Sequence, residues 1–389
     1  MSRPQFTTDG EEWSRSRSLL RPQFTREQVS QLELEEYHLQ KAMVALPVDD
    51  AGWTQKTDIQ PIFFRLTIDS ATEFLFGESV ESQMAAVKHG VGDDFSVEFD
   101  KSQWYCVKRA RFEKIHWMAD NKESQQSAQQ VHAFVDRFVQ SAMDRVKDEK
   151  NVDEEKAGPY VFSHALARAT QDPVELRSQL LNILLAGRDT TASLLSWTML
   201  LLAHHPQVFH KLRQIILDTF GTYTQPKPIT FAGLKSCQYL QYTLNEVLRL
   251  YPVVPMNRRI AVRDTTIPRG GGPDGSLPVF VPKGSGVGYN VHIMHRRKDI
   301  WGDDAEEFKP ERWVGRKVGW DYIPFNGGPR ICIGQQFALT EAGYVLVRLL
   351  QRFDNIENHC LPRDEMRYNL TLTSCPADPV LVRLHEASV

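Results

Sequence analysis

The stretch FNGGPRICIGQQFALTEAG, residues 325–343, places a single cysteine, Cys332, shortly after two glycines, a proline and Arg330. A helix-like run begins immediately behind it. Free cysteine usually behaves as a small buried hydrophobe, so core packing is the simplest explanation of Cys332. Core packing leaves the glycine-rich loop unexplained, because glycine loses more conformational freedom on folding than any other residue. The loop therefore indicates a task for the thiol beyond packing.

A second unusual pattern, AGRDTT at residues 186–191, interrupts a strongly apolar segment with Gly187 and Asp189. A glycine inside a helix costs about 1 kcal/mol relative to alanine, and burying a carboxylate without a partner costs more than that. We expect that something large and flat lies against the helix at this point. The alternative is an accidental kink with Asp189 turned towards solvent.

Composition excludes several classes of protein. The five cysteines are scattered and form no C-x-x-C pair, which argues against a disulfide framework or a zinc site and indicates a reducing compartment. A net charge of -3 lacks the basic character that nucleic-acid binding requires, so no nucleic-acid partner is expected. The longest apolar run, Leu194–Ala203, is about half of the ~20 residues that a membrane span needs, and the N-terminus shows no signal sequence. We therefore expect no membrane anchor in the chain as given.

The elements that must position these residues are mostly helical. The N-terminal region predicts two helices broken near Pro22, with Asp9 capping the first. Residues 145–156 carry a charge run that predicts a surface loop. Between Pro173 and Pro206 the pattern predicts a helix of roughly 30 residues, buried on every face at its centre. Residues 258–291 predict short strands separated by Gly and Pro turns. The fold class is thus mainly α with a minor β-sheet.

Charged pairs at helical spacing complete the pattern. Glu246 and Arg249 lie three residues apart and share a helix face, and Arg312 offers a second cation for Glu246. Trp13 and Arg17, four apart, share a face of the first helix. Each pair is unspecific by itself.

Their order along the chain, which ends in F-x-x-G-x-R-x-C-x-G, resembles the haem-thiolate monooxygenases of the cytochrome P450 superfamily. The resemblance extends over the chain from Trp13 onwards and implies one haem-thiolate domain, residues 1–389. It also implies that the family's N-terminal anchor, first sheet strands and early helices are missing from this chain. The fungal branch that hydroxylates n-alkanes and fatty acids is the most similar, on the segments LRPQF, AGRDTT, LRLYPVVPMNRR, PRGGGPDGS, HRRKDIWG and NGGPRICIGQQFALTEA.

The resemblance implies that Cys332 is the axial ligand of the iron of haem b. A thiolate donates electron density to the iron and favours O–O cleavage. At the start of a helix its pKa should be lowered. Gly327 and Gly328 would let the loop fold tightly around the sulfur, Gly334 would let the helix approach the porphyrin, and Phe325 would shield the sulfur.

The two haem propionates need cations at the porphyrin edge. By position in the family, Arg330, Arg17 and Arg259 resemble the propionate partners, with Trp13 as an indole N–H donor. Arg258 is an alternative to Arg259. The Glu246, Arg249 and Arg312 set resembles the family's structural triad, outside the chemistry.

On the oxygen side, Ala186 and Gly187 would make the long helix thin above the iron. Asp189 and Thr190 resemble the acid–alcohol pair that guides protons to dioxygen. The implied reaction inserts one oxygen atom of O2 into a C–H bond of an apolar substrate. No flavin or nicotinamide motif is present, so the resemblance implies electrons from NADPH through NADPH-cytochrome P450 reductase.

Further expectations concern the substrate, the partner and the location. Val253 and Val254, after the E-x-x-R helix, should contact a long-chain alkane or fatty acid. Arg15, Lys298 and Arg348 should attract an acidic reductase. The family belongs to the cytosolic face of the endoplasmic reticulum membrane. The anchor missing from this chain makes a cytoplasmic location the alternative, with membrane association expected only for the full-length family.

Two other functions stay open at this point. The first is a haem-thiolate enzyme that uses peroxide or rearranges hydroperoxides without a reductase. The second is a non-catalytic truncated remnant that keeps the proximal half of the haem site. The intact pair of Asp189 and Thr190 favours the monooxygenase.

Overall fold

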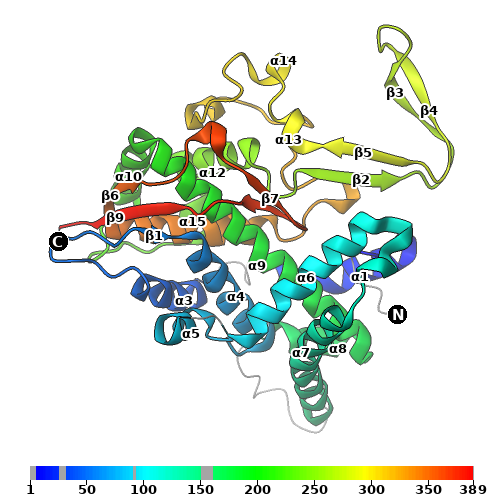
Figure 1. The fold of residues 1–389 in the computed structure, drawn as a ribbon, viewed down its shortest axis with the longest axis horizontal. Coiled ribbons are helices and arrows are strands. Elements are labelled where there is room, and N and C mark those ends of the chain that lie inside the picture. The colour runs from blue at the N-terminus through cyan, green and yellow to red at the C-terminus, as the bar shows by residue number, and fades with distance from the viewer. Residues whose placement is uncertain (1–5, 26–31, 91–92, 150–160, 389) are drawn as a thin grey trace.

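The computed structural model describes residues 6–25, 32–90, 93–149 and 161–388, and Figure 1 shows their arrangement. Helices form most of the described chain, and four small antiparallel sheets accompany them there. The longest helix, α9 (Pro173–His204), crosses the middle of the molecule, and the other helices lie around it (Figure 1). The prediction of a mainly α fold with a minor β component is confirmed.

The longer helices of the described chain are α1 (Gly10–Leu20), α3 (Glu33–Val44), α4 (Gln60–Phe76), α5 (Ser82–His89), α6 (Asp94–Phe112), α7 (Lys122–Glu149), α8 (Phe162–Ala169), α9, α10 (Pro206–Phe220), α12 (Gln238–Leu250) and α15 (Gln335–Arg352). Short helices are α11 (Phe231–Ser236), α13 (Val291–Met294) and α14 (Lys298–Trp301). The 3-10 turns are η1 (Arg21–Phe24), η2 (Glu113–Ala119), η4 (Pro310–Trp313), η5 (Gly328–Arg330) and η6 (Arg363–Glu365).

The strands form one three-stranded and three two-stranded sheets in the described residues. The first has the order β1-β9-β6, from Thr57–Asp58, Leu381–Glu386 and Phe353–Asn358. The two-stranded antiparallel pairs are β2 (Met256–Ile260) with β5 (Gly286–Asn290), β3 (Thr265–Gly271) with β4 (Leu277–Val281), and β7 (Tyr368–Leu370) with β8 (Ser374–Pro376). The β3–β4 hairpin projects away from the helices (Figure 1). These strands confirm the prediction for residues 258–291.

Helix α9 has clear start and stop signals. Asp172 caps it, because its carboxylate accepts hydrogen bonds from the backbone N–H groups of Val174 and Glu175 at 2.9 and 3.3 Å. Pro173 occupies the first turn, where a missing N–H costs nothing. Residues 191–203 are all buried, as the apolar pattern predicted. A long helix covered on every side can hold a functional segment in a fixed place.

Two hydrophobic clusters cover different halves of α9. The second half packs with α3, α4, α10, α12 and α15 in the larger cluster. The first half packs with α4, α7 and α8 in a second cluster, against which Phe24 and Ile333 also pack. Ile333 directly follows Cys332, so the cysteine loop is attached to the same cluster as the first half of α9.

The predicted salt-bridged set around Glu246 is confirmed. Arg249 and Arg312 both bind the Glu246 carboxylate, with shortest N–O distances of 2.8 and 3.2 Å. Arg249 also donates to the carbonyl groups of His295 and Ala305 at 2.8 and 2.6 Å. The set therefore joins α12 to the chain around η4.

Three predictions for the surface need correction. Asp9 stands at the N-cap position of α1, but its side chain does not cap the helix and accepts from Arg330 instead. Helix α7 extends through Glu149, so the first part of the charge run at 145–156 is helical; residues 150–156 lie outside the described residues. Arg348 is buried, with its side chain 8% exposed and paired with Glu36 at 2.9 Å, so it is not a surface contact for a reductase.

Candidate functional site

The loop before Cys332 is closed by its own backbone. The N–H of Cys332 donates to the carbonyl of Phe325 at 2.9 Å, and η5 fills the space between them. Gly328 has a φ of +69°, and Asn326 one of +67°. Gly328 therefore adopts a left-handed conformation that residues with a Cβ rarely take. This explains part of the glycine requirement predicted from the sequence.

The neighbouring Gly327 is needed for a different reason. Its backbone is extended, but a Cβ placed on it would lie 2.5 Å from Cζ3 of the Trp320 indole. At Gly334, by contrast, a Cβ would be only in ordinary contact with the ring of Phe24, at 3.8 Å. The described chain thus gives no steric reason of its own for Gly334, and its predicted role of approaching a porphyrin stays a prediction.

Helix α1 brings two predicted residues to the cysteine loop. Arg17 donates from Nη2 to the carbonyl of Ile331, next to Cys332, at 2.9 Å. The guanidinium of Arg330 lies over the Trp13 ring at 4.7 Å, and that of Arg17 at 5.8 Å. The structure therefore gathers Trp13, Arg17, Arg330 and Cys332 into one cluster, although they come from opposite ends of the sequence.

Polar contacts fix α1 against the long helix. Gln179 of α9 donates to the hydroxyl of Ser16 at 2.9 Å, in a buried position. Arg15 pairs with Glu175 of α9 at 3.2 Å at the surface. Because both contacts join α1 to α9, the cations next to Cys332 have a fixed position relative to α9.

Opposing effects act on the pKa of the Cys332 thiol. The sulfur-bearing side chain is exposed, yet protein surrounds it closely enough that desolvation raises the thiol pKa above its usual value. The backbone N–H of Gly334 and the charge of Arg17 oppose this and lower the pKa. The prediction that the thiol pKa of Cys332 is lowered is therefore wrong. The backbone N–H of Gly334 at the helix start does lower this pKa, but desolvation raises it by more.

The structure distinguishes the two candidate arginines on β2. Arg258 is 62% exposed in its side chain and lies 3.5 Å from Glu113. Arg259 lies on the half-buried face of the strand and stacks over the ring of Tyr289 at 5.5 Å. The Tyr289 hydroxyl donates to the side chain of Asn326 at 2.5 Å, inside the cysteine loop. Through Tyr289, Arg259 is thus the one connected to the loop.

The predicted oxygen-side residues lie together on α9. Ala186, Gly187 and Thr190 are all partly exposed, in contrast to the fully buried half of the helix behind them. A Cβ on Gly187 would meet only Ala71, at 4.0 Å, so the surface is open there. The Thr190 hydroxyl donates to the carbonyl of Ala186 at 2.6 Å. The helix is therefore thin at the position where the sequence predicted a flat ligand.

Asp189 does not turn towards solvent, so the alternative of an accidental kink is wrong. Its side chain is 5% exposed and lies 3.2 Å from Nη1 of Arg188. Arg188 in turn pairs with Asp100 of α6. Desolvation raises the pKa of Asp189 to about 6, partly offset by Arg188. The carboxyl can therefore exchange a proton close to neutral pH.

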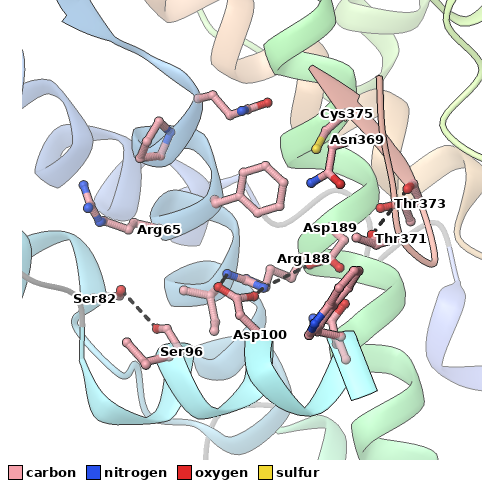
Figure 2. A pocket seen from close by; sticks show the side chains of 17 residues that line it. Arg65, Ser82, Ser96, Asp100, Arg188, Asp189, Asn369, Thr371, Thr373 and Cys375 are labelled. Atoms are coloured by element: carbon pink, nitrogen blue, oxygen red, sulfur yellow. Dashed lines mark hydrogen bonds and ion pairs between the residues drawn. The ribbon is translucent and has the colours of Figure 1, made fainter. Parts of the chain in front are cut away.

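Arg188 and Asp100 are functional candidates that the sequence analysis did not select. Both line a cavity of about 440 Å³ together with Asp189, between α4, α6, α9 and the β7–β8 pair (Figure 2). Sequence adjacency gave no signal for Arg188, because consecutive residues on a helix do not face each other. Asp100 lies 88 residues away in sequence, and no local pattern connects it to α9.

The remaining predicted contacts are placed as follows. Val253 is buried in the larger hydrophobic cluster, and Val254 beside it is half-buried. Lys298, at the start of α14, and Arg15 are exposed, as a surface contact for a partner requires.

The donor set at Cys332 matches a haem better than a bare metal ion. Within the described residues, no three His, Cys, Asp or Glu side chains gather as metal ligands. A metal held by Cys332 must therefore bring most of its ligands with it, as the iron of a porphyrin does. Arg17 and Arg330 supply positive charge for propionates. Arg330 now binds Asp9, but the Asp9 side chain is 91% exposed, so this ion pair is weak and replaceable.

In the part of the chain that the structure describes, no helix combines the length and apolar character that crossing a membrane requires.

Comparisons with known proteins show the family of the chain and its fold. A sequence profile described as Cytochrome P450 matches residues 2–377. "Cytochrome P450 monooxygenase g430" of Fusarium sp is 55% identical over 97% of this chain and 68% of its own length. "Cytochrome P450 52A13" of Debaryomyces hansenii is 47% identical over 97% of this chain and 74% of its own length. The crystal structure of a cytochrome P450 (CYP102L1) covers 99% of this chain and 81% of that chain, with 26% identity and a TM-score of 0.78.

Proposed function

Because the chain belongs to the cytochrome P450 family and is a haem-thiolate monooxygenase, we propose that Cys332 ligates the haem iron and that the substrate is a long-chain n-alkane or fatty acid. The observation that carries the ligand assignment is the gathering of Trp13, Arg17 and Arg330 around an accessible cysteine that belongs to no group of three ligating side chains in the described residues.

When bound, the haem supplies the capacity to activate O2 for insertion into a C–H bond, with its thiolate ligand donating electron density. The chain's own residues then have separate tasks. Arg17 and Arg330 bind the propionates, with Arg259 as a third cation and Trp13 as an N–H donor. Phe325 covers the sulfur. Metal binding requires the thiolate, so Cys332 releases its proton when the site is loaded.

Protons for the reaction come from the α9 side. Asp189 is buried and has a pKa of about 6, which is suited to giving and taking protons near neutral pH. Thr190 is the next residue, and its hydroxyl is held at the Ala186 carbonyl. We assign to Thr190 the orientation of the last proton donor and to Asp189 the proton supply. This pair supports the monooxygenase over an enzyme that uses peroxide.

The substrate class rests on two supports. The sequence resembles the fungal branch that hydroxylates n-alkanes and fatty acids, and the relatives described above are fungal. Val254 is half-buried shortly after the end of α12, and we assign to it a contact with the apolar chain. Electrons reach the enzyme from a redox partner. The finer proposal is NADPH-cytochrome P450 reductase as that partner, at the cytosolic face of the endoplasmic reticulum membrane.

Turnover with defined substrates tests the proposal. The purified protein, loaded with haem, is combined with NADPH-cytochrome P450 reductase, NADPH and either dodecane, dodecanoic acid or a small polar aromatic. We expect a shift of the haem to high spin and a hydroxylated product with the first two compounds. Binding of the aromatic together with failure of both long chains would overturn the substrate class, and absence of a reduced carbon monoxide difference band typical of a thiolate ligand would overturn the ligand assignment.

A further inference from the structure

Three charged side chains meet at the wall of the 440 Å³ cavity: Arg188 and Asp189 from α9, and Asp100 from α6 (Figure 2). Arg188 Nη1 lies 3.2 Å from an oxygen of Asp189 and also contacts Asp100. Nη2 binds the second oxygen of Asp100 at 3.1 Å. One guanidinium is therefore shared between two carboxylates.

The contact between Arg188 and Asp189 is not a default of helix geometry. Consecutive residues on an α-helix point about 100° apart and do not face each other. The guanidinium reaches Asp189 because other elements hold it. It lies over the rings of Phe64 on α4 at 5.3 Å and Phe99 on α6 at 5.7 Å. Two aromatic faces and one carboxylate thus fix a side chain that is only 5% exposed.

The two acids differ in their environment. The side chain of Asp189 is 5% exposed, whereas that of Asp100 is 57% exposed. Desolvation raises the pKa of Asp189, the charge of Arg188 lowers it, and the charge of Asp100 raises it. Asp100 binds Arg188 through both oxygens and so competes with Asp189 for the same positive charge. The proton affinity of Asp189 is therefore coupled to a residue on another helix.

Other ionisable groups near Asp189 are few. Arg65 on α4 lines the same cavity, and so does Cys375 on β8, which interacts electrostatically with Asp189. The α6 side otherwise contributes Gln103 and Trp104, and the β7–β8 pair contributes amide and hydroxyl groups. Arg188 is thus the one cation in direct contact with the Asp189 carboxylate among the described residues.

We propose that Arg188 is a positioning residue for the proton supply: it orients the carboxylate of Asp189, and Asp100 on α6 controls how much of its charge Asp189 receives. The inference rests on the proposed function, in which Asp189 supplies protons. It makes the position of α6 part of the chemistry. If α6 moves so that Asp100 leaves Arg188, the whole guanidinium becomes available to Asp189, which then binds its proton less tightly.

Two substitutions that act on opposite sides of Arg188 test this. Asp100→Asn removes the competitor, so the apparent pKa of Asp189 should fall. Arg188→Gln removes the cation, so the same pKa should rise, by roughly one to three pH units for a contact of this kind. The measurement is a pH titration of the Asp189 carboxyl by its infrared C=O band in the haem-loaded protein. The band is assigned by its loss in Asp189→Asn.

A second readout follows the reaction. The pH at which hydroxylated product per NADPH falls to half should move in the same direction as the infrared titration in each variant. Arg188→Lys keeps the charge and should restore a titration close to that of the native protein. The matched control is Arg177→Gln, which breaks an ion pair between the same helix and Asp136 on α7 at 2.8 Å and should move neither curve.

The outcomes separate the proposals. The pKa of Asp189 could instead shift in the same direction in Asp100→Asn and Arg188→Gln, or in neither. Either result would overturn the role of Arg188, because a mere loss of packing would not shift this pKa in opposite directions in the two variants. Asp100 is exposed, so Asp100→Asn keeps the test valid if Arg188→Gln fails to fold; an unchanged titration in Asp100→Asn then decides against the role. If the infrared shifts are opposite but the protein hydroxylates none of the tested substrates, the positioning role of Arg188 is supported and the proposed function is refuted.

Discussion

Arg249 and Glu246 face each other across one turn of α12 through two hydrogen bonds, Nε to Oε2 at 2.8 Å and Nη2 to Oε1 at 2.9 Å. Neither side chain has any solvent exposure. The indole N–H of Trp313 donates to the same carboxylate at 3.0 Å. A buried charge pair of this kind contributes little net stability over an apolar pair, but removing one partner leaves the other buried without part of its compensation.

Removing one half should therefore be severe. Arg249→Ala leaves the buried Glu246 carboxylate with Arg312 as its remaining cation and removes the guanidinium that binds the carbonyl groups of His295 and Ala305, so we expect a loss of about 3–5 kcal/mol in the free energy of unfolding. Urea unfolding followed by circular dichroism measures it. Arg297→Ala, which breaks the exposed pair with Asp299, is the control and should unfold with the native protein. Equal midpoints for the two variants would contradict the structural role of the pair.

The ligand assignment predicts a selective effect among the cysteines. Cys332→Ala should abolish the reduced carbon monoxide band of a thiolate-ligated haem, because no other described cysteine lies in the cluster with Arg17 and Arg330. Cys106→Ala and Cys237→Ala should keep that band. A thiolate band that survives in Cys332→Ala would show that another residue is the ligand.

A pair of buried carboxyl groups, Glu341 and Glu35, predicts how the stability of the fold depends on pH. Glu341 on α15 accepts a hydrogen bond from Ser70 on α4 at 3.1 Å, and desolvation raises its pKa to about 7. The pKa of Glu35 on α3 is also raised well above its usual value, by desolvation and by the charge of Glu341. Because the folded-state pKa lies above the unfolded one, these acids stabilise the fold when protonated. Their contribution is complete at acidic pH and is lost as pH rises through about 7.

Glu341→Gln should remove part of that loss. Thermal unfolding should show a smaller decrease of the midpoint between mildly acidic and mildly alkaline pH than in the native protein. Glu365→Gln, in an exposed turn after β6, is the control and should keep the native slope. An unchanged pH slope in Glu341→Gln would mean that the pair does not titrate in this range.

The sequence was sufficient where the signal is local or ordered along the chain. The set of Glu246, Arg249 and Arg312 could be predicted because two members share a helix turn and the third has a characteristic neighbourhood. The same holds for α9, whose ends are marked by Pro173 and Pro206. Gly328 could be predicted as well, because glycine is the residue that most readily adopts a left-handed conformation.

The sequence was insufficient where partners meet only after folding. The contact of Arg17 with the carbonyl of Ile331 spans 314 residues, and that of Arg188 with Asp100 spans 88. Arg348 was wrongly expected at the surface because of its charge. It is buried, and the carboxylate of Glu36 on α3 compensates the loss of hydration of its guanidinium. The thiol pKa of Cys332 was also beyond the sequence, because desolvation depends on the packing of distant segments.

The proton-delivery role of Thr190 gives the last prediction, and it begins with a bond the structure shows. The Thr190 hydroxyl donates to the carbonyl of Ala186 at 2.6 Å, a contact that Thr198 repeats further along α9 with Leu194 at 2.7 Å. Thr198 is fully buried, whereas Thr190 is partly exposed beside Gly187. The two threonines share one local geometry and differ in what they face.

Thr190→Ala should therefore leave haem content and substrate binding intact but reduce coupling. NADPH should still be consumed with the reductase, with more of it recovered as hydrogen peroxide and less as hydroxylated product, because general acid catalysis of this kind contributes roughly 10²–10⁴-fold. Asp189→Asn should instead slow turnover, since it impairs the proton supply. Thr198→Ala removes the same backbone contact away from the site and should keep the native ratio of product to NADPH. If the ratio of product to NADPH is unchanged in Thr190→Ala, the hydroxyl has no role in proton delivery and Thr190 only packs in the helix.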